Sequence, residues 1–319
     1  MTSHNVHPSR RAALASAGAA AMGTLLLMGC AATSTVHPSA ASASPRRVLW
    51  AANVRNKSLA DRLRAAQAGG FTHMSVFPID YATWRKQGMS ALQIRQSIHA
   101  AGVRVLAIDP FVQWVPNFAV PDWYPADYRG FIEFNETQIL QMAEELEAEA
   151  VNCVEGLGQT YSQAVLIERF AAFADRAKAR GLRVTLEFMP ISSIPDLATA
   201  WPIIKGADRS NAGLCFDTWH YFRSKPDDAL LQTIPGNKIF EVQLADALNK
   251  LQGKDLTDDL LRFRRLPGEG ELPIARIVPI LKQMGAWRSV GPEVFADSMD
   301  ALSAQEAGKQ AGQSLVRWL

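Results

Sequence analysis

Four short apolar stretches in the 319-residue sequence each end in a side chain that carries oxygen. Runs of this kind are typical of buried strands, and the C-terminal ends of parallel strands meet at one edge of a sheet or barrel. We therefore expect the four side chains to share one site. They are Glu187 after VTL, Asp217 after GLCF, Gln243 after FEV and Glu293 after VGP.

Three of these four groups are carboxylates, which would repel one another if nothing lay between them. A divalent cation relieves that repulsion, and hard oxygen ligands favour Mn²⁺, with Mg²⁺, Co²⁺ or Zn²⁺ as alternatives. The barrel region contains only His73, His99 and His220, so a histidine-rich site with several zinc ions is not expected. Two alternatives remain open: Asp217 caps the following helix, or Gln243 fills the interior without binding metal.

Short apolar runs alternate with amphipathic segments from residue 46 to residue 319. Eight such pairs in about 270 residues predict one (β/α)₈ TIM barrel, with its active site at the C-terminal strand ends. The aromatic, proline-rich loop 110–129 is expected to form a lid or pocket wall. Strands are expected at 48–53, 72–77, 103–109, 151–155, 182–189, 213–217, 238–245 and 289–295, and helices at 58–67, 90–101, 133–148, 162–180, 194–205, 227–233, 273–284 and 301–319.

The composition suits a soluble globular protein. Hydrophobic residues make up 48% of the chain and charged residues 20%, with a formal net charge of +2. That charge is too balanced and too dispersed to support nucleic-acid binding.

The first thirty residues have the features of an export signal rather than of a fold. Arg10 and Arg11 precede an Ala/Gly/Leu-rich stretch that is too short for a comfortable membrane span. The paired arginines resemble a twin-arginine signal, and LMGC resembles a bacterial lipobox with Cys30 as the lipidated residue. An ordinary secretory signal or a disordered tail is the alternative. With residues 31–45 as a flexible tether, we expect an exported lipoprotein anchored on the periplasmic or cell-surface side of a membrane.

The two remaining cysteines each stand two residues before an acid at a strand end: Cys153 before Glu155, and Cys215 before Asp217. Residues two apart on a strand share a face, so both thiols are expected inside the barrel if the acids point inward. A disulfide between them is possible, but small buried core residues are the favoured interpretation.

The motifs at these strand ends resemble those of the xylose-isomerase-like superfamily, which includes sugar epimerases and isomerases, inosose dehydratases and 3-dehydroshikimate dehydratases. The resemblance implies that Glu187, Asp217, Gln243 and Glu293 bind one divalent metal. Many members have His where Gln243 stands, while the dehydroshikimate dehydratases are among those with Gln. The motifs are LEFMP (186–190), GLCFDTWH (213–220), VQLADA (242–247), LPGEGELP (266–273) and VGPEVF (290–295).

The resemblance also assigns catalytic roles. Glu187 and Glu293 would exchange the substrate proton as base and acid, and His220 would contact the substrate, with a structural imidazole as its alternative. Epimerases often have an Arg six residues after the third ligand, where this chain has Asn249. One of the arginines in the loop that follows, with Arg265 our candidate, would then supply the cation. Glu155 is a further candidate for binding a substrate hydroxyl, unless it orders a loop.

These features predict a metal-dependent isomerase or epimerase that acts on a keto-sugar or cyclitol by proton transfer through an enediolate stabilised by the metal. The acidic loop PGEGE would repel a phosphate, which favours a neutral carbohydrate-like substrate. A dehydratase is the nearest alternative, and an inactive carbohydrate-binding lipoprotein is another. A homo-oligomer is possible on this sequence.

Overall fold

The computed structural model describes residues 44–120, 122, 124 and 126–319. The expected signal peptide, the lipidation site Cys30 and all but the last two residues of the tether lie outside the described residues. Among the helices that are described, none has the length and apolar character needed to cross a membrane.

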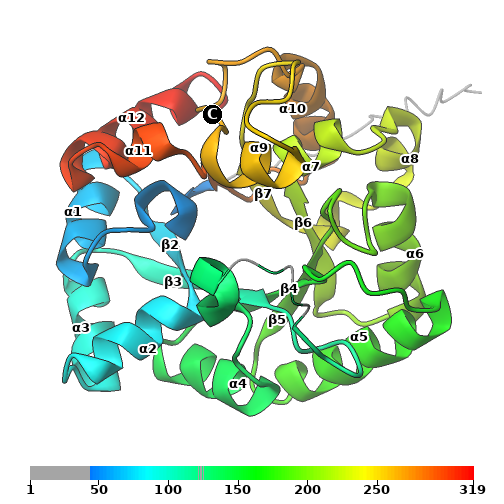
Figure 1. Ribbon diagram of the computed structural model, residues 1–319, viewed down its shortest axis with the longest axis horizontal. Helices are drawn as coiled ribbons and strands as arrows, with labels where there is room; N and C mark the ends of the chain where they lie inside the picture. Colours follow the sequence, from blue (N-terminus) through cyan, green and yellow to red (C-terminus); the bar gives the residue numbers. More distant parts are fainter. Residues whose placement is uncertain (1–43, 121, 123, 125) are drawn as a thin grey trace, which may run out of the picture. The chain divides into compact units, whose positions relative to one another are not determined.

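Eight parallel strands form a closed barrel in sequence order, with β8 pairing back onto β1 (Figure 1). This confirms the predicted (β/α)₈ architecture. The strands are β1 (Arg46–Leu49), β2 (His73–Val76), β3 (Arg104–Phe111), β4 (Ala150–Val154), β5 (Arg183–Glu187), β6 (Ala212–Asp217), β7 (Ile239–Leu244) and β8 (Ser289–Pro292).

Helices surround the barrel, and several of them begin at a residue whose side chain caps the first turn. Ser58, Ser90 and Ser162 each accept a hydrogen bond from a backbone N–H in the first turn of the helix that follows. The α-helices are α1 (Leu59–Gly69), α2 (Pro78–Lys86), α3 (Ala91–Ala100), α4 (Glu136–Glu145), α5 (Gln163–Lys178), α6 (Leu197–Ala207), α7 (Thr218–Arg223), α8 (Asp228–Thr233), α9 (Leu256–Arg262), α10 (Ile274–Gln283), α11 (Asp297–Asp300) and α12 (Ala304–Val316).

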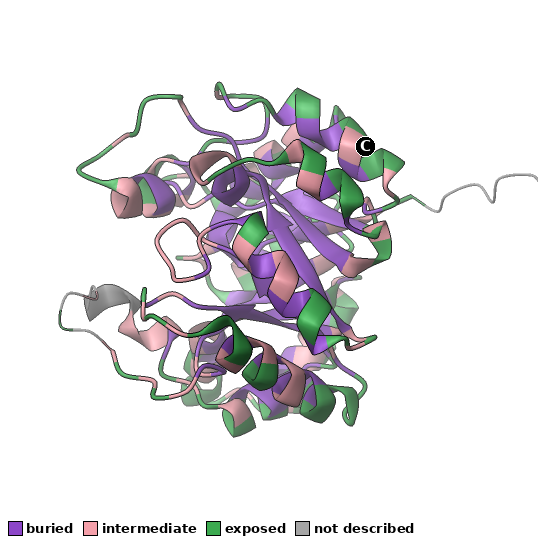
Figure 2. Ribbon diagram, turned by 90° about the vertical axis from the view of Figure 1, so that its right-hand side faces the viewer, coloured by how far each residue is buried: buried purple, intermediate pink, exposed green. Residues whose placement is uncertain are grey.

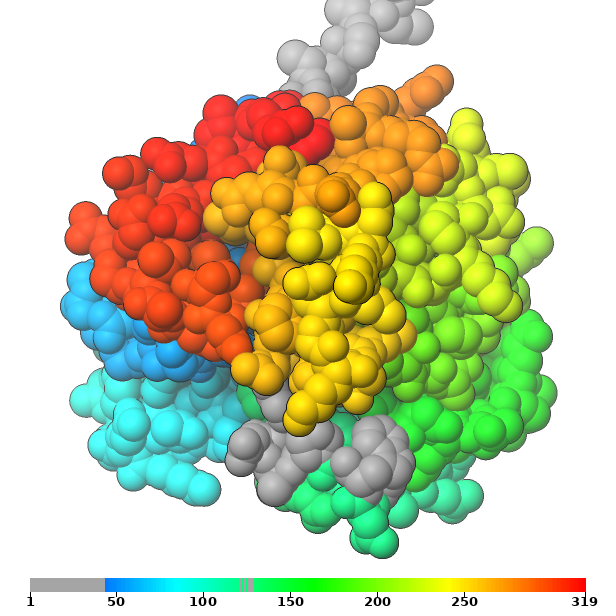
Figure 3. Space-filling model, turned by 45° about the horizontal axis from the view of Figure 1, so that its top comes forward, coloured from blue at the N-terminus to red at the C-terminus, as the bar shows by residue number. Residues whose placement is uncertain are grey.

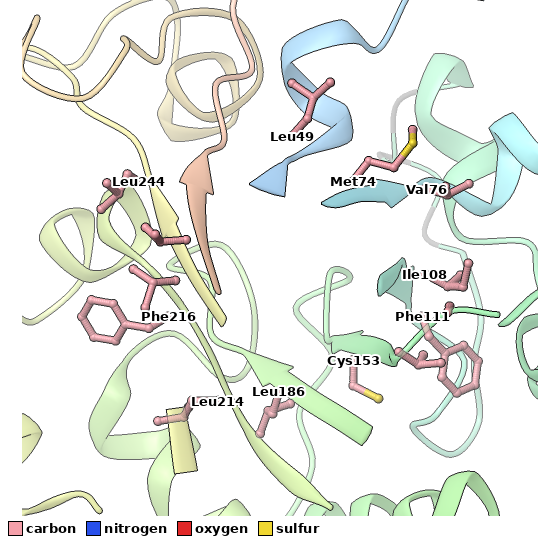
Figure 4. Close-up of a cluster of buried hydrophobic side chains, with 14 of the residues drawn as sticks. Leu49, Met74, Val76, Ile108, Phe111, Cys153, Leu186, Leu214, Phe216 and Leu244 are labelled. Atoms are coloured by element: carbon pink, nitrogen blue, oxygen red, sulfur yellow. The ribbon is translucent and has the colours of Figure 1, made fainter. Parts of the chain in front are cut away.

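Side chains alternate between the barrel interior and the layer beneath the helices, so the strands are buried on both faces (Figure 2). The outer layer is apolar and includes Leu186, Phe216 and Leu244 (Figure 4). The inner positions of β5 to β7 are polar towards their C-terminal ends. This alternation directs the oxygen-bearing groups to one place.

The alternation corrects one expectation about the cysteines. Cys215 lies inside the barrel, close to the charges of Glu187 and Glu241. Cys153 instead lies in the outer core beside Phe111 and Leu186 (Figure 4), because Asn152 takes the inward position on β4. The thiols are therefore on opposite sides of the barrel wall, and both are free.

Candidate active site

The four oxygen-bearing groups lie at the C-terminal rim of strands β5 to β8. Asp217 is the register partner of Gln243 on the neighbouring strand. Glu187 is the last residue of β5, and Glu293 directly follows β8. All four are buried: Glu187 is 5% exposed, Glu293 4%, and the other two 0%. The structure thus brings together the residues that the sequence analysis grouped.

Asp217 serves two purposes at the start of α7. Its Oδ1 accepts a hydrogen bond from the backbone N–H of His220 at 2.9 Å, so it caps the helix. Its Oδ2 accepts one from Arg264 Nη1, also at 2.9 Å. Burial, the largest influence, would raise the pKa of Asp217, but the charge of Arg264 together with smaller contributions, including the hydrogen bond from the backbone N–H of His220, lowers it. Asp217 is therefore an ionised carboxylate in the centre of the site.

His220 and Glu187 face each other, with His220 Nε2 3.1 Å from Glu187 Oε1. Burial lowers the pKa of His220 to about 3, so the imidazole is neutral near pH 7. Burial, followed by the charge of Asp217, raises the pKa of Glu187 to about 8. A carboxyl group whose pKa lies near the working pH is suited to exchange a proton.

Gln243 and Glu293 form the other side of the site. Gln243 Nε2 donates to Glu293 Oε1 at 3.0 Å. Gln243 Oε1 is buried and has no hydrogen-bond partner among the described residues. Burial, followed by the charge of Glu187, raises the pKa of Glu293 well above its usual value. An amide oxygen left without a partner beside a carboxyl is the kind of group that a cation would satisfy.

The arginine in the site is Arg264, whereas the sequence analysis selected Arg265. Arg264 is 2% exposed, and its guanidinium lies between the rings of Trp219 (4.9 Å) and Phe295 (5.2 Å). Arg265 is exposed, and its Nη1 lies 3.5 Å from the carbonyl oxygen of Glu269. Neighbouring residues on this extended segment point to opposite sides, so only one of the two can enter the barrel.

Asn152 and Asp109 are site residues that the sequence analysis did not select. Asn152 Nδ2 donates to Glu187 Oε2 at 2.6 Å and to Asp109 Oδ1 at 2.9 Å. Its Oδ1 accepts from Thr185 Oγ1 at 2.8 Å. Burial, followed by the charge of Glu187, raises the pKa of Asp109 to about 8. The signal in the sequence was a lone amide inside the apolar run AVNCV.

Glu155 has the loop-ordering role that the sequence analysis left as its alternative. Its carboxylate accepts hydrogen bonds from the backbone N–H groups of Leu157, Gly158, Gln159 and Ser193, at 2.7–3.3 Å. It is fully buried and does not line the cavity described next.

A cavity of about 240 Å³ opens above these groups. Its polar lining includes Asp109, Glu187, His220, Arg264 and Glu293, while most of the remaining lining is apolar. Helix α9 contributes lining residues, and the gold segment around it lies across the middle of the face in Figure 3.

The long aromatic loop forms part of the cavity wall through Pro110, Val112 and Tyr124. Phe111 and Trp114 are instead buried in the outer core, against Phe173 and Phe170 respectively. Apolar walls around a few polar groups are typical of small-molecule sites.

The donor set suits a divalent cation. Glu187, Asp217 and His220 each offer a ligand atom, and these atoms lie within 4.8 Å of one another. The unpartnered amide oxygen of Gln243 adds a fourth possible donor. Carboxylate, amide and imidazole groups together suit Mn²⁺, Co²⁺ or Zn²⁺, and the oxygen-rich composition also admits Mg²⁺.

A family model described as "Xylose isomerase-like TIM barrel" matches residues 63–319. The chain belongs to this family. Among curated proteins, this xylose isomerase-like barrel is 24% identical over 264 residues to a 3-dehydroshikimate dehydratase of Pseudomonas putida, covering 81% of this chain and 39% of the relative. It is 31% identical over 142 residues to an inosose isomerase of Halalkalibacterium halodurans, covering 44% of this chain and 49% of the relative. The chain thus spans half or less of these curated relatives.

Solved structures show the same barrel. The crystal structure of the IOLI protein with a bound zinc atom superposes with a TM-score of 0.73 at 20% identity, covering 86% of this chain and 97% of that one. The probable 3-DHS dehydratase AsbF of Bacillus anthracis superposes with a TM-score of 0.64 at 14% identity, covering 85% and 98%. At these identities the likeness establishes the fold. The two curated relatives are enzymes that act on small molecules.

Proposed function

We propose that this protein is a divalent-metal-dependent isomerase or epimerase that moves a proton beside the carbonyl of a small keto-sugar or cyclitol. The observation that carries the proposal is the pair of buried carboxyls on β5 and β8. Glu187 and Glu293 line the same cavity, and burial raises the pKa of both. Two carboxyls of this kind can remove a proton from one position of a substrate and return it at another.

In this proposal Glu187, Asp217, Gln243 and Glu293 would hold the metal, and His220, the third member of the cluster described above, would contact the substrate instead. A divalent cation there would polarise a carbonyl oxygen and a neighbouring hydroxyl, and so lower the cost of removing the proton between them. Glu187 would take that proton, with its carboxyl oriented by Asn152 and His220. Glu293 would return it.

The cavity walls would exclude water during this exchange. Phe77, Met189 and Phe295 are among the apolar lining residues, and they surround the polar floor. His220 lines the cavity, and its Nδ1 is buried without a hydrogen-bond partner among the described residues. We propose that His220 contacts a substrate hydroxyl.

A dehydratase is the second candidate, and Gln243 favours it. The resemblance noted above gives the dehydroshikimate dehydratases a glutamine at this position. The match to the P. putida dehydratase also covers 81% of the chain, against 44% for the inosose isomerase of H. halodurans. The first step would be the same proton removal. A β-hydroxyl would then leave as water, and a carbon–carbon double bond would form.

Proton exchange tests the proposal directly. The protein, supplied with Mn²⁺, is incubated in D₂O with a panel of keto-sugars, inososes and 3-dehydroshikimate, and deuterium incorporation beside the carbonyl is followed by NMR. We expect incorporation with at least one substrate, reduced about 10³-fold in Glu187→Gln and Glu293→Gln. Glu269→Gln, an exposed glutamate outside the cavity lining, is the control that should keep the wild-type rate.

The product separates the two candidates. Retention of every substrate atom favours the isomerase or epimerase, whereas loss of water with new ultraviolet absorbance favours the dehydratase. No incorporation on the whole panel would count against both reactions and would favour a carbohydrate-binding protein without activity.

We also propose that the protein is exported and anchored by a lipid on Cys30. The support is the resemblance of LMGC to a lipobox and of the paired arginines to an export signal.

A further inference from the structure

The guanidinium of Arg264 lies among the carboxylates that would hold the metal. Its Nη1 donates to Asp217 Oδ2 at 2.9 Å and to Glu293 Oε2 at 3.2 Å. Its Nη2 lies 3.3 Å from His220 Nε2. A positive charge therefore already contacts three groups of the site. Without it, the carboxylates of Asp217 and Glu293 would be buried with no cation beside them.

Arg264 also divides the donor set into an open and a closed half. Glu187 and Glu293 line the cavity together with Arg264. Asp217 and Gln243 are fully buried and are absent from the cavity lining. A cation arriving from the cavity would meet the arginine before it could reach all four donors.

The guanidinium and a divalent cation would compete for the same oxygens. Two positive charges a few ångströms apart repel strongly in a buried site. The contacts that Arg264 makes with Asp217 and Glu293 would be weakened by a metal bound to those residues. The adjoining cavity of about 240 Å³ has room for the displaced group. Displacement would also break the hydrogen bond that Arg264 Nε, part of the same guanidinium, donates to the carbonyl oxygen of Leu260 at 3.0 Å.

We infer that Arg264 is an internal counter-ion that holds the metal site together without metal and is displaced towards the cavity when a divalent cation binds. The inference rests on the proposed metal site. Arg264 would lower the affinity of the site for metal. Metal binding would in turn move the guanidinium so that it faces the cavity.

Calorimetric titration of the metal-free protein with Mn²⁺ tests the competition. Arg264→Met removes the charge and keeps an apolar stem between Trp219 and Phe295. We expect this variant to bind Mn²⁺ at least about tenfold more tightly than the wild type, because the metal no longer competes with a buried charge. Arg265→Met, the exposed neighbour, should bind as the wild type does.

A second measurement follows the side chain itself. Phenylglyoxal modifies accessible arginines, and mass spectrometry can resolve the neighbouring positions. Arg264 should be protected in the metal-free protein and should react when Mn²⁺ is saturating. Arg262 and Arg265 are exposed and provide internal references that react in both states.

The outcomes separate this inference from the proposed function. The inference alone would be overturned if the wild type binds Mn²⁺ and Arg264→Met binds it no more tightly. It would also be overturned if saturating Mn²⁺ leaves the labelling of Arg264 unchanged. Binding by Arg264→Met but not by the wild type would support the counter-ion role and count against a metal-dependent reaction. If neither protein binds Mn²⁺, both the inference and the proposed function are overturned.

If Arg264→Met does not fold without metal, Arg264→Lys is titrated instead. Arg264→Lys keeps the positive charge but loses the paired N–H donors, so this variant should bind Mn²⁺ more tightly than the wild type does. An equal or lower affinity for Mn²⁺ would overturn the inference.

Discussion

Asn152 connects the barrel interior to the proposed base, Glu187. Its amide oxygen accepts from Thr185 Oγ1, so the amide is held in one orientation. Both hydrogen bonds from the amide nitrogen then go to carboxyls, one to Glu187 and one to Asp109. A fixed donor of this kind aligns the oxygen that must meet a substrate proton, and a small misplacement of that oxygen slows the reaction.

Replacing Asn152 by leucine should therefore affect rate more than binding. Asn152→Leu keeps a similar volume and removes both donors. We expect the rate of proton exchange to fall about 10- to 100-fold with little change in KM, and the metal affinity to fall within the same range. Deuterium exchange kinetics and Mn²⁺ titration measure the two effects.

Thr185→Val is the matched control, because it removes the bond that orients the amide and leaves both donors present. Its loss of rate should be smaller. If Asn152→Leu exchanges protons as fast as the wild type does, Asn152 has no positioning role and only fills the barrel.

The sequence predicted the strand-end groups of the site but not the groups that surround them. Glu187, Asp217, Gln243 and Glu293 each close an apolar run, and alternation along a strand determines the side to which each points. Arg264 follows no such rule, because it lies in the segment RFRR, where three arginines have the same local pattern. Which of the three arginines enters the site depends on how that segment pairs with neighbouring loops. Arg264 N donates to Phe295 O, and Arg265 pairs with Asp246.

At the scale of elements, the first and last helices of the ring pack unusually closely. Helices α1 and α12 lie side by side (Figure 1) and make the most extensive contact between any two elements. Small residues allow this approach. A Cβ on Gly308 would lie 2.0 Å from the carbonyl oxygen of Ala65, and one on Gly312 would lie 2.3 Å from that of Gly69. The backbones are therefore in direct contact where the chain closes its ring.

Gly308→Ala should destabilise the protein although alanine is the better helix former. Helix propensity alone would favour the change by about 1 kcal/mol. The collision with the Ala65 carbonyl forces the two helices apart and costs about 3 kcal/mol, so the net loss should be about 2 kcal/mol. Urea denaturation measures the free energy of unfolding.

Lys309→Ala is the control on the same helix. The side chain is exposed, and the change should stay within about 0.5 kcal/mol of the wild type. Equal stability of Gly308→Ala and the wild type would mean that the two helices can separate without loss.

Most helices and strands were predictable because their hydrophobic periodicity agrees with the capping residues at their ends. The elements that were missed are short. Helix α9 lies inside what the sequence indicated as a long loop. Seven residues are too few to show a helical period, and the Asp255 cap is the only local signal. Helix α2 begins with Pro78 only one residue after β2 ends, and a proline at that place in the sequence indicates a turn. Strand β1 ends at Leu49, four residues early, because residues 51–54 form a 3₁₀ turn.

At the scale of the whole molecule, the chain enters the barrel on the face opposite the cavity. Arg46 begins β1 at the N-terminal end of the strands, whereas the cavity lies at their C-terminal ends. Glu149 fixes this entry point through ion pairs with Arg46 and Arg183 and a contact with His73. Arg46 therefore lies at the end of the barrel away from the cavity.

The proposed lipid anchor predicts how the whole protein partitions. Cys30→Ala removes the thiol that would receive the diacylglycerol. Expressed in a bacterium that processes lipoproteins, the wild type should fractionate with membranes and enter the detergent phase of Triton X-114. The variant should move to the aqueous phase, because a short tether has no apolar surface to hold it. Its rate of proton exchange should match the wild type, since the barrel starts sixteen residues later at Arg46.

Cys153→Ala controls for the loss of a cysteine as such, because that thiol is buried in the outer core and cannot be lipidated in the folded barrel. It should partition with the wild type. If Cys30→Ala stays in the membrane fraction to the same extent, the anchor is not a lipid on this residue. Retention would then point to the apolar stretch 12–28 as an uncleaved membrane segment, which detection of that stretch in the purified protein by mass spectrometry would establish.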